Sequence, residues 1–374
     1  MVTHSFLVTW VAGKASIMKA GDRHPSHCFV VDVKHRLNKT GLGEPVPLGA
    51  GGRTTCKWLN DHRFSSFLLQ HFMSKSIKED TTMQYSGAFT ALVTPYKNSM
   101  VDEDAYRALI EWQIEQGIDG LVPCGTTGES ATLSHEEHKQ VISICVDQVK
   151  GRVPVIAGAG SNCTREAIEL TRYAKEAGAD ATLLITPYYN KPTPEGVVAH
   201  FKAIASDVSI PFVVYNVPGR TSLNVMPKTV ARIYKEIPEA IGIKEATGDL
   251  RQVSEVVEEC GPDFIVLSGD DFTVLPLLSV GGHGVISVVS NIVPAMMHAM
   301  CKAYAEKNLE QALKLHFEMA PLCRAMLMET NPSPVKTSLA LMGKMQKEFR
   351  LPMVPMLPEN EERLESLLSS KGLI

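Results

Sequence analysis

Short apolar runs alternate with amphipathic segments along most of the chain. Eight of these runs lie between residues 87 and 290, and a helix-like segment follows each one. Parallel strands that are covered on both faces have this near-continuous apolar composition. The predicted strands are residues 87–96, 119–125, 153–160, 181–187, 211–217, 240–247, 264–270 and 284–290.

The segments between the runs carry helix signals. Residues 102–117 begin with acids, continue with apolar residues at helical spacing and end in a glycine. Residues 135–151 and 164–178 are also amphipathic, and Ser134 with Glu137 fits a capping box. Eight strand–helix units predict an α/β fold of the (β/α)8 TIM-barrel type. The rival, an open doubly wound sheet, usually has fewer strands and often a glycine-rich loop after the first strand, and "TPYKNSMVDED" is no such loop.

Both ends of the chain differ from this middle part. Residues 1–82 show no sustained period of 2 or 3.6, and we expect a disordered extension, a targeting segment or a non-native translation. The catalytic barrel is predicted over residues 83–306. A small C-terminal helical domain is predicted over residues 307–374. Its helical patterns lie at residues 309–328, 334–345 and 360–372.

Composition excludes several classes of function. The net charge of −4 gives no basic surface for nucleic acid. No apolar run is long enough to span a bilayer, so no membrane role is predicted. The eight cysteines are scattered without metal-ligand spacing, and no Lys or Arg precedes the apolar stretch at residues 6–13. Reduced thiols and a cytoplasmic location are therefore expected.

Polar motifs stand at the ends of five predicted strands. The carboxyl ends of TIM-barrel strands carry the active site. Hydroxyls, phenols, one arginine and one lysine are therefore expected to meet at one rim. The motifs are "GTTGES" (125–130), "TPYYN" (186–190), "YNVPGRT" (215–221), "GIKEATG" (242–248) and "SGDD" (268–271).

Lys244 is a charge inside an apolar strand. A buried lysine paired with an acid is the bland interpretation, but the adjacent Glu245 points to the opposite face of a strand. Burial lowers the pKa of a lysine and leaves part of the amine neutral. A neutral amine attacks a ketone and forms a Schiff base. The sequence thus predicts aldolase-type chemistry without a metal or another cofactor.

Schiff-base chemistry needs proton carriers, and neighbouring strand ends supply them. Tyr215 would donate and accept protons, Thr126 would relay them, and a second tyrosine would complete the chain. Arg220, behind a Pro-Gly turn, suits a carboxylate. The alternatives are a core aromatic for Tyr215, helix capping for Thr126 and Thr127, and a surface arginine for Arg220. "SGDD" is the nearest approach to a metal-binding cluster, and no metal site is predicted.

Residues 85–374 resemble the dihydrodipicolinate synthase family of pyruvate-dependent class I aldolases. The motifs "GTTGESATLSHEEH", "TPYYNKP", "YNVPGRT", "GIKEATG", "LSGDD" and "GGHGVISV" match in order. The resemblance implies a lyase that condenses pyruvate with L-aspartate 4-semialdehyde on the way to diaminopimelate and lysine.

The resemblance also implies roles for the catalytic residues. Lys244 would form the imine with pyruvate, and Tyr215 would be the central acid and base. Thr126 would link Tyr215 to Tyr189, which in this family reaches across from the partner subunit. A homotetramer of two tight dimers is expected on the same ground.

Two further groups of residues follow from the resemblance. Thr127 would hold the pyruvate carboxylate, Gly269 and Ile286 would shape the pocket, and Arg220 would bind the semialdehyde carboxylate. Feedback inhibition by L-lysine is predicted because a matching set of effector residues is present. This set is Ser130, Ala131, His135, His138, Asn162, Glu166 and Tyr188.

Two alternatives stay open at this point. Sugar-acid lyases such as N-acetylneuraminate lyase share the lysine and the tyrosine, but the arginine in "YNVPGRT" favours the synthase. A non-catalytic barrel that binds pyruvate or lysine would need no proton relay, and the set of Lys244, Tyr215, Thr126 and Tyr189 therefore argues against it.

Overall fold

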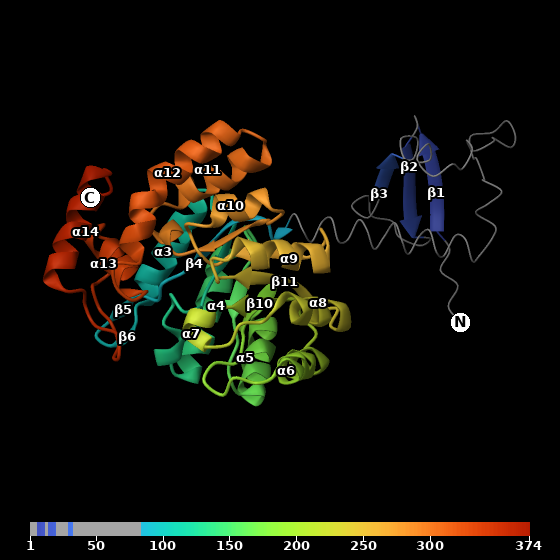
Figure 1. Ribbon diagram of the computed structural model, residues 1–374, viewed down its shortest axis with the longest axis horizontal. Helices are drawn as coiled ribbons and strands as arrows, with labels where there is room; N and C mark the ends of the chain where they lie inside the picture. Colours follow the sequence, from blue (N-terminus) through green and yellow to red (C-terminus); the bar gives the residue numbers. More distant parts are fainter. Residues whose placement is uncertain (1–5, 12–13, 20–28, 33–83) are drawn as a thin grey trace, which may run out of the picture. The chain divides into compact units, whose positions relative to one another are not determined.

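The computed structural model describes residues 6–11, 14–19, 29–32 and 84–374 (Figure 1). The chain divides into two compact units, Met1–Lys78 and Glu79–Ile374. In the first unit, β1 (Phe6–Val11), β2 (Lys14–Lys19) and β3 (Phe29–Asp32) form an antiparallel sheet. The remaining residues up to 83 lie outside the described residues. The expectation of a disordered or non-native extension over residues 1–82 therefore stays a prediction.

The second unit is built on eight parallel strands, one for each predicted run. Hydrogen bonds join them in the order β7-β4-β13-β12-β11-β10-β9-β8. Leu121 and Val155 form a parallel bridge that brings the two outer strands together, so the sheet curls into a nearly closed barrel. The strands are β4 (Gly87–Ala91), β7 (Gly120–Val122), β8 (Ile156–Gly158), β9 (Ala181–Ile185), β10 (Phe212–Asn216), β11 (Ala240–Glu245), β12 (Ile265–Ser268) and β13 (Gly284–Ser287).

A helix follows each barrel strand and covers the outside of the sheet (Figure 1). The TIM-barrel prediction is thereby confirmed. A short hairpin, β5 (Tyr96–Lys97) with β6 (Met100–Val101), comes between β4 and its helix. The covering helices are α3 (Glu103–Glu115), α4 (His135–Val149), α5 (Thr164–Ala177), α6 (Pro194–Asp207), α8 (Pro227–Glu236), α9 (Leu250–Cys260), α10 (Val274–Ser279) and α11 (Pro294–Ala305).

Local sequence signals fix the ends of these helices. Ser134 Oγ accepts a hydrogen bond from the Glu137 backbone N–H, and the Glu137 carboxylate accepts one from the Ser134 N–H, which confirms the predicted capping box of α4. Thr193 caps α6, with Pro194 at its first turn. Gly178 ends α5 in the left-handed conformation that glycine adopts without strain.

Three helices follow the barrel: α12 (Leu309–Met326), α13 (Ser333–Leu341) and α14 (Pro358–Ser370). Met319 and Met326 on α12 are buried in one continuous apolar cluster with Leu109 of α3. These methionines are therefore part of the core. These helices fall within the same compact unit as the barrel, and a domain boundary near residue 307 stays a prediction.

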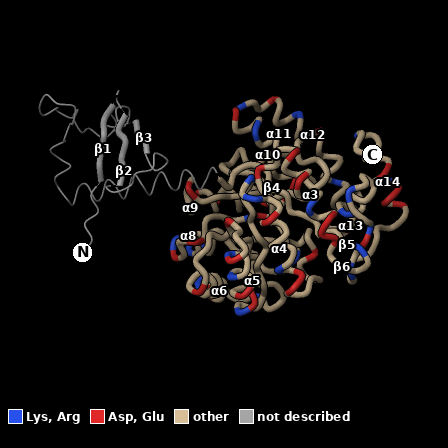
Figure 2. Tube along the Cα trace, turned by 180° about the vertical axis from the view of Figure 1, so that it is seen from behind, with Lys and Arg blue, Asp and Glu red and all other residues tan. Residues whose placement is uncertain are grey.

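Charges of both signs are interspersed around the barrel helices (Figure 2). Ion pairs join successive helices, such as Arg107 with Asp147 at 2.6 Å and Lys139 with Glu169 at 2.9 Å. Exposed pairs of this kind each contribute little to stability. No helix in the described part of the chain has the length and apolar character needed to cross a membrane.

Candidate active site

Lys244 and Tyr215 lie side by side on neighbouring strands. The parallel register of β10 and β11 pairs the two residues directly. Lys244 Nζ is 4.3 Å from the centre of the Tyr215 ring, and the residues are only 6% and 7% exposed. Tyr215 belongs to the apolar cluster that fills the barrel interior, so both side chains point inward. No acid among the described residues forms an ion pair with Lys244.

Glu245 faces the opposite side of β11, as the alternation along a strand predicts. Its carboxylate accepts hydrogen bonds from Asn216 Nδ2 at 3.1 and 3.3 Å and from Gln252 Nε2 at 3.2 Å. Burial raises the pKa of this carboxyl. The acid next to Lys244 in sequence is therefore not its partner in space, and Lys244 is left available inside the barrel.

Gly269 and Ile286 come from the next two strand ends. A Cβ atom on Gly269 would lie 3.1 Å from Lys244 Cε and 2.6 Å from the Ala246 Cβ. These short contacts leave no room for a side chain at position 269, so a glycine is needed beside the aliphatic part of the Lys244 side chain. Ile286, on β13, is buried in the same interior cluster as Tyr215.

The loop after β7 carries Thr126 and Thr127. Thr127 is buried, and its Oγ1 accepts a hydrogen bond from Asn331 Nδ2 at 3.0 Å. Arg220, on the short helix α7 (Pro218–Thr221), donates to the Asn331 backbone carbonyl at 3.4 Å. Asn331 thus connects two predicted substrate-binding residues. Sequence reasoning missed Asn331, and the signal available was its place in "TNPSP" (330–334), the proline-containing segment that leads into α13.

A buried ion pair anchors the same loop to the C-terminal helices. Lys336 of α13 pairs with Glu129, and their side chains are 0% and 1% exposed. Lys336 Nζ also lies 4.1 Å from the Tyr96 ring centre. Burial lowers the pKa of Lys336. Because an unpaired buried charge is very costly, this pair holds Glu129 and the loop before it in place.

Tyr189 stands apart from the other predicted catalytic residues. It is 90% exposed and has a φ of 69°, which is rare for a tyrosine. Neither its hydroxyl nor those of Thr126 and Tyr215 hydrogen-bonds to another described residue. The predicted relay between them is therefore not formed within one chain.

Four of the predicted effector residues, His135, Asn162, Glu166 and Tyr188, contact one another in pairs near the start of α5. His135 Nε2 lies 2.6 Å from Glu166 Oε1, and Asn162 Nδ2 donates to the Tyr188 carbonyl at 3.2 Å. His138 is buried, with Nε2 2.7 Å from the Gly158 carbonyl. Ser130 and Ala131 form a short 3-10 turn that leads toward α4.

Hydrogen bonds and burial set the protonation states of Glu166 and His138 among the predicted effector residues. A hydrogen bond from Ser161 lowers the pKa of Glu166, and the bond to His135 lowers it further. Burial lowers the pKa of His138. At neutral pH the cluster therefore presents one carboxylate that is partly exposed, and a carboxylate of this kind suits an ammonium group.

The two acids of "SGDD" accept hydrogen bonds from backbone N–H groups. Asp271 Oδ2 accepts hydrogen bonds from the N–H groups of Val288 and Val289 at 3.1 and 2.8 Å, and Asp270 Oδ1 accepts from Phe272 N–H at 3.1 Å. Within residues 6–11, 14–19, 29–32 and 84–374, no three His, Cys, Asp or Glu side chains are grouped to hold a metal.

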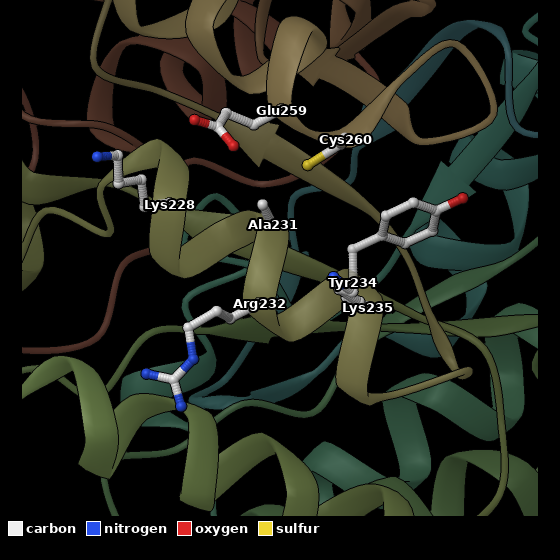
Figure 3. Close-up of a pocket in the computed structure, with 7 residues that line it drawn as sticks. All are labelled: Lys228, Ala231, Arg232, Tyr234, Lys235, Glu259 and Cys260. Carbon is white, nitrogen blue, oxygen red and sulfur yellow. The ribbon is translucent and has the colours of Figure 1, made fainter.

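A separate pocket lies between α8 and α9 (Figure 3). Lys228, Lys235 and Arg232 line one side of it. Arg232 is already paired with Glu195 at 2.5 Å. None of the predicted site residues lines this pocket, which is a surface feature of two helices.

Comparison with known proteins identifies the family. The family model described as "Dihydrodipicolinate synthetase family" matches residues 84–371. A 4-hydroxy-tetrahydrodipicolinate synthase of Nitratidesulfovibrio vulgaris (strain DSM 19637 / Miyazaki F) is 67% identical over 292 residues, which are 78% of this chain and 100% of the relative.

Solved structures agree with this match. The chloride-inhibited dihydrodipicolinate synthase of Acinetobacter baumannii, complexed with pyruvate, is 45% identical with a TM-score of 0.75, covering 77% of this chain and 99% of that one. The enzyme of Cyanidioschyzon merolae with lysine bound is 38% identical with a TM-score of 0.75, covering 78% and 99%. The family-model match over residues 84–371 and the 67% identical relative show that the chain belongs to the dihydrodipicolinate synthetase family.

Proposed function

We propose that this chain is a 4-hydroxy-tetrahydrodipicolinate synthase, a lyase that condenses pyruvate with L-aspartate 4-semialdehyde. The observation that carries the proposal is the inward-facing Lys244, which has no acid as partner among the described residues and lies 4.3 Å from the Tyr215 ring. Such an amine is placed to act as a nucleophile. The relatives named above carry this same activity in their names.

The reaction follows from the chemistry of an imine. Lys244 attacks the ketone carbon of pyruvate, and water leaves as the imine forms. The protonated imine withdraws electrons and makes the adjacent methyl group acidic. Loss of a methyl proton gives an enamine, whose carbon then attacks the aldehyde of the second substrate. Tyr215, beside the amine, carries the protons that these steps release and consume.

The remaining site residues have supporting roles in this proposal. Thr126 relays protons between Tyr215 and the Tyr189 of a partner subunit. Thr127 holds the pyruvate carboxylate. Gly269 and Ile286 shape the pocket around Lys244, and Arg220 binds the carboxylate of the semialdehyde. The contact of Asn331 with both Thr127 and Arg220 supports a carboxylate-binding wall on this side.

A homotetramer of two tight dimers is part of the proposal. The exposure of Tyr189, at 90%, supports a site that a second copy of the chain completes. Sedimentation analysis tests this assembly, and an active monomer would contradict it. A cytoplasmic location is likewise proposed, and cell fractionation tests it.

Feedback inhibition by L-lysine is proposed at the cluster around Glu166. The carboxylate would bind the ammonium group of the effector, while Asn162 and the Tyr188 carbonyl offer further hydrogen-bonding groups. Tyr188 precedes Tyr189, so a ligand here is adjacent to the proposed relay. Full activity in millimolar L-lysine would contradict the proposal.

Borohydride trapping tests the proposed function directly. The protein is incubated with pyruvate, reduced, digested and analysed by mass spectrometry. A pyruvate-derived adduct on Lys244 is expected. A folded protein without the adduct would instead be a binding module. Aldehyde specificity then separates the synthase from a sugar-acid lyase, because only the synthase turns over L-aspartate 4-semialdehyde.

The first 82 residues are not needed in this proposal. The family model begins at residue 84, and Met83 immediately precedes it. A chain that starts at Met83 is therefore expected to retain the activity of the full chain. Loss of soluble, active protein on this truncation would contradict the proposed barrel boundary.

A further inference from the structure

Two site motifs place a polar residue on the outer face of the barrel, directly after a catalytic one. These residues are Asn216, after Tyr215, and Glu245, after Lys244. We propose that Glu245 and Asn216 are positioning residues, at the centre of a buried network that sets the places of Lys244, Tyr215 and Arg220. The inference rests on the proposed function of those three residues.

Glu245 is the point where donors from three segments meet. Its carboxylate accepts from Asn216 Nδ2 on the neighbouring strand, from Gln252 Nε2 on α9 at 3.2 Å, and from the Thr247 backbone N–H at 2.9 Å. The residue is 2% exposed. A buried carboxylate is stable only when such donors surround it, so its position is set by theirs.

The strand register transmits this position to the inner face. Asn216 is paired with Glu245 in the same parallel ladder that pairs Tyr215 with Lys244. Successive side chains on a strand point to opposite faces. The outer bond between amide and carboxylate therefore fixes how far the inner phenol and amine are offset along the strands. A slip of one residue would break this bond.

The same network closes the loop that carries Arg220. Asn216 Nδ2 donates to Asn224 Oδ1 at 2.8 Å, and Asn216 Oδ1 accepts from the Val225 N–H at 3.1 Å. These contacts join the two ends of the segment that contains α7. Asn224 and Gln252 also exchange two hydrogen bonds, of 2.8 and 3.0 Å. The base of the Arg220 loop is thus tied to Glu245.

The polar character of the network points to positioning rather than to stability. Apolar residues of similar volume in a buried site are often at least as stabilising as a buried charge. A hydrogen-bonded network also fixes the relative positions of its members, because each donor–acceptor pair tolerates only a narrow range of distances and angles. This constraint reaches the catalytic residues, because Tyr215 and Lys244 are one position away from Asn216 and Glu245 on the same strands.

The test compares Glu245→Gln with the wild-type full chain. The glutamine amide presents a donor nitrogen to a site that holds three donors, so the network must rearrange. Borohydride trapping of pyruvate on Lys244 is expected to slow roughly 10- to 100-fold, as for a small misplacement of reacting groups. The kcat should fall in parallel and the KM for the semialdehyde should rise. The matched control is Glu258→Gln, an exposed residue of α9, which should behave as the wild type.

Gln252→Met keeps the inference testable if Glu245→Gln does not fold. Methionine fills the same volume at the edge of the network but removes the bonds to Asn224 and Glu245. We expect a smaller fall in trapping rate and kcat, and a smaller rise in the KM for the semialdehyde, than in Glu245→Gln. Folded variants with wild-type trapping rate, kcat and KM, and a change in Tm alone, would overturn the inference. Absence of trapping in the wild type would instead overturn the proposed function, and this inference with it.

Discussion

Tyr215 lies with its ring 4.3 Å from Lys244 Nζ, while its hydroxyl has no hydrogen-bond partner among the described residues. The ring therefore packs against the amine, and the hydroxyl is free for proton transfer. Tyr215→Phe keeps the ring and removes the hydroxyl. We expect kcat to fall roughly 10²- to 10⁴-fold, as for the loss of a general acid or base, while pyruvate is still trapped on Lys244. Steady-state kinetics measure the fall, and Tyr234→Phe on α8 is the control. An unchanged kcat would remove Tyr215 from the proton path.

Gly269→Ala tests the room around the lysine stem. The new Cβ would lie 2.6 Å from the Ala246 Cβ and 3.1 Å from Lys244 Cε, and the strand must shift to relieve this overlap. Imine formation should slow by at least about tenfold, since a small misplacement of the amine is costly. Gly219→Ala is the control, because its added Cβ would have no atom within 4 Å beyond its chain neighbours and its own helix backbone. Wild-type trapping by Gly269→Ala would show that the lysine does not depend on this glycine.

Arg220→Met separates the two substrates. A guanidinium that grips a carboxylate contributes about 1.5–3 kcal/mol, so kcat/KM for the semialdehyde should fall roughly 10- to 100-fold. Trapping of pyruvate should change far less. The comparison needs both assays on the same preparation, with the exposed Arg251→Met as control. An equal fall in both assays would mean that Arg220 does not act on the semialdehyde.

Glu166→Gln tests the effector cluster. The hydrogen bonds from Ser161 and His135 keep the pKa of Glu166 below its usual range, so the group is a carboxylate at neutral pH. Loss of this charge should raise the L-lysine concentration for half-inhibition at least about tenfold, relative to the variant's own uninhibited rate. Glu169→Gln, on the same helix and paired with Lys139, should keep wild-type inhibition. If both variants were inhibited alike, the effector would bind elsewhere.

His200 predicts a pH dependence of stability. Burial lowers its pKa to about 4, while an unfolded histidine has a pKa near 6.5. Below about pH 6.5 the unfolded chain therefore takes up a proton that the folded chain does not, and stability falls as the pH falls. By pH 5 this one group should cost about 2 kcal/mol. Urea unfolding of wild type and His200→Gln at pH 7 and pH 5 measures the difference. Equal losses in both proteins would contradict the assignment.

The sequence predicted the barrel well because its signals are local. Each strand is an apolar run, and most covering helices have a cap or a period that a short window contains. The predicted strands were too long at their ends: residues 87–96 contain a strand that stops at Ala91. Beyond it the apolar residues Leu92 and Val93 are buried in the loop that leads to the site, and burial alone does not distinguish a loop from a strand.

The separation of Lys244 from Glu245 onto opposite faces was also predictable, because side chains alternate along a strand. Asn331 was not, since it meets Thr127 across 204 residues of sequence. Lys336 lies in the predicted helical pattern at residues 334–345, which gave no sign that its side chain is fully buried against Glu129. Contacts between distant segments leave no periodic trace in the sequence, and the structure alone places them.

The buried pair of Glu129 and Lys336 has a consequence for the order in which the site forms during synthesis. Glu129 leaves the ribosome 207 residues before its partner. Until α13 has been made, this carboxylate has no cation, and burying it alone would cost several kcal/mol. The loop with Thr126 and Thr127 therefore settles only after nearly the whole chain has emerged. We therefore expect the eight barrel strands, which end at Ser287, to leave the ribosome before the partner of Glu129 does.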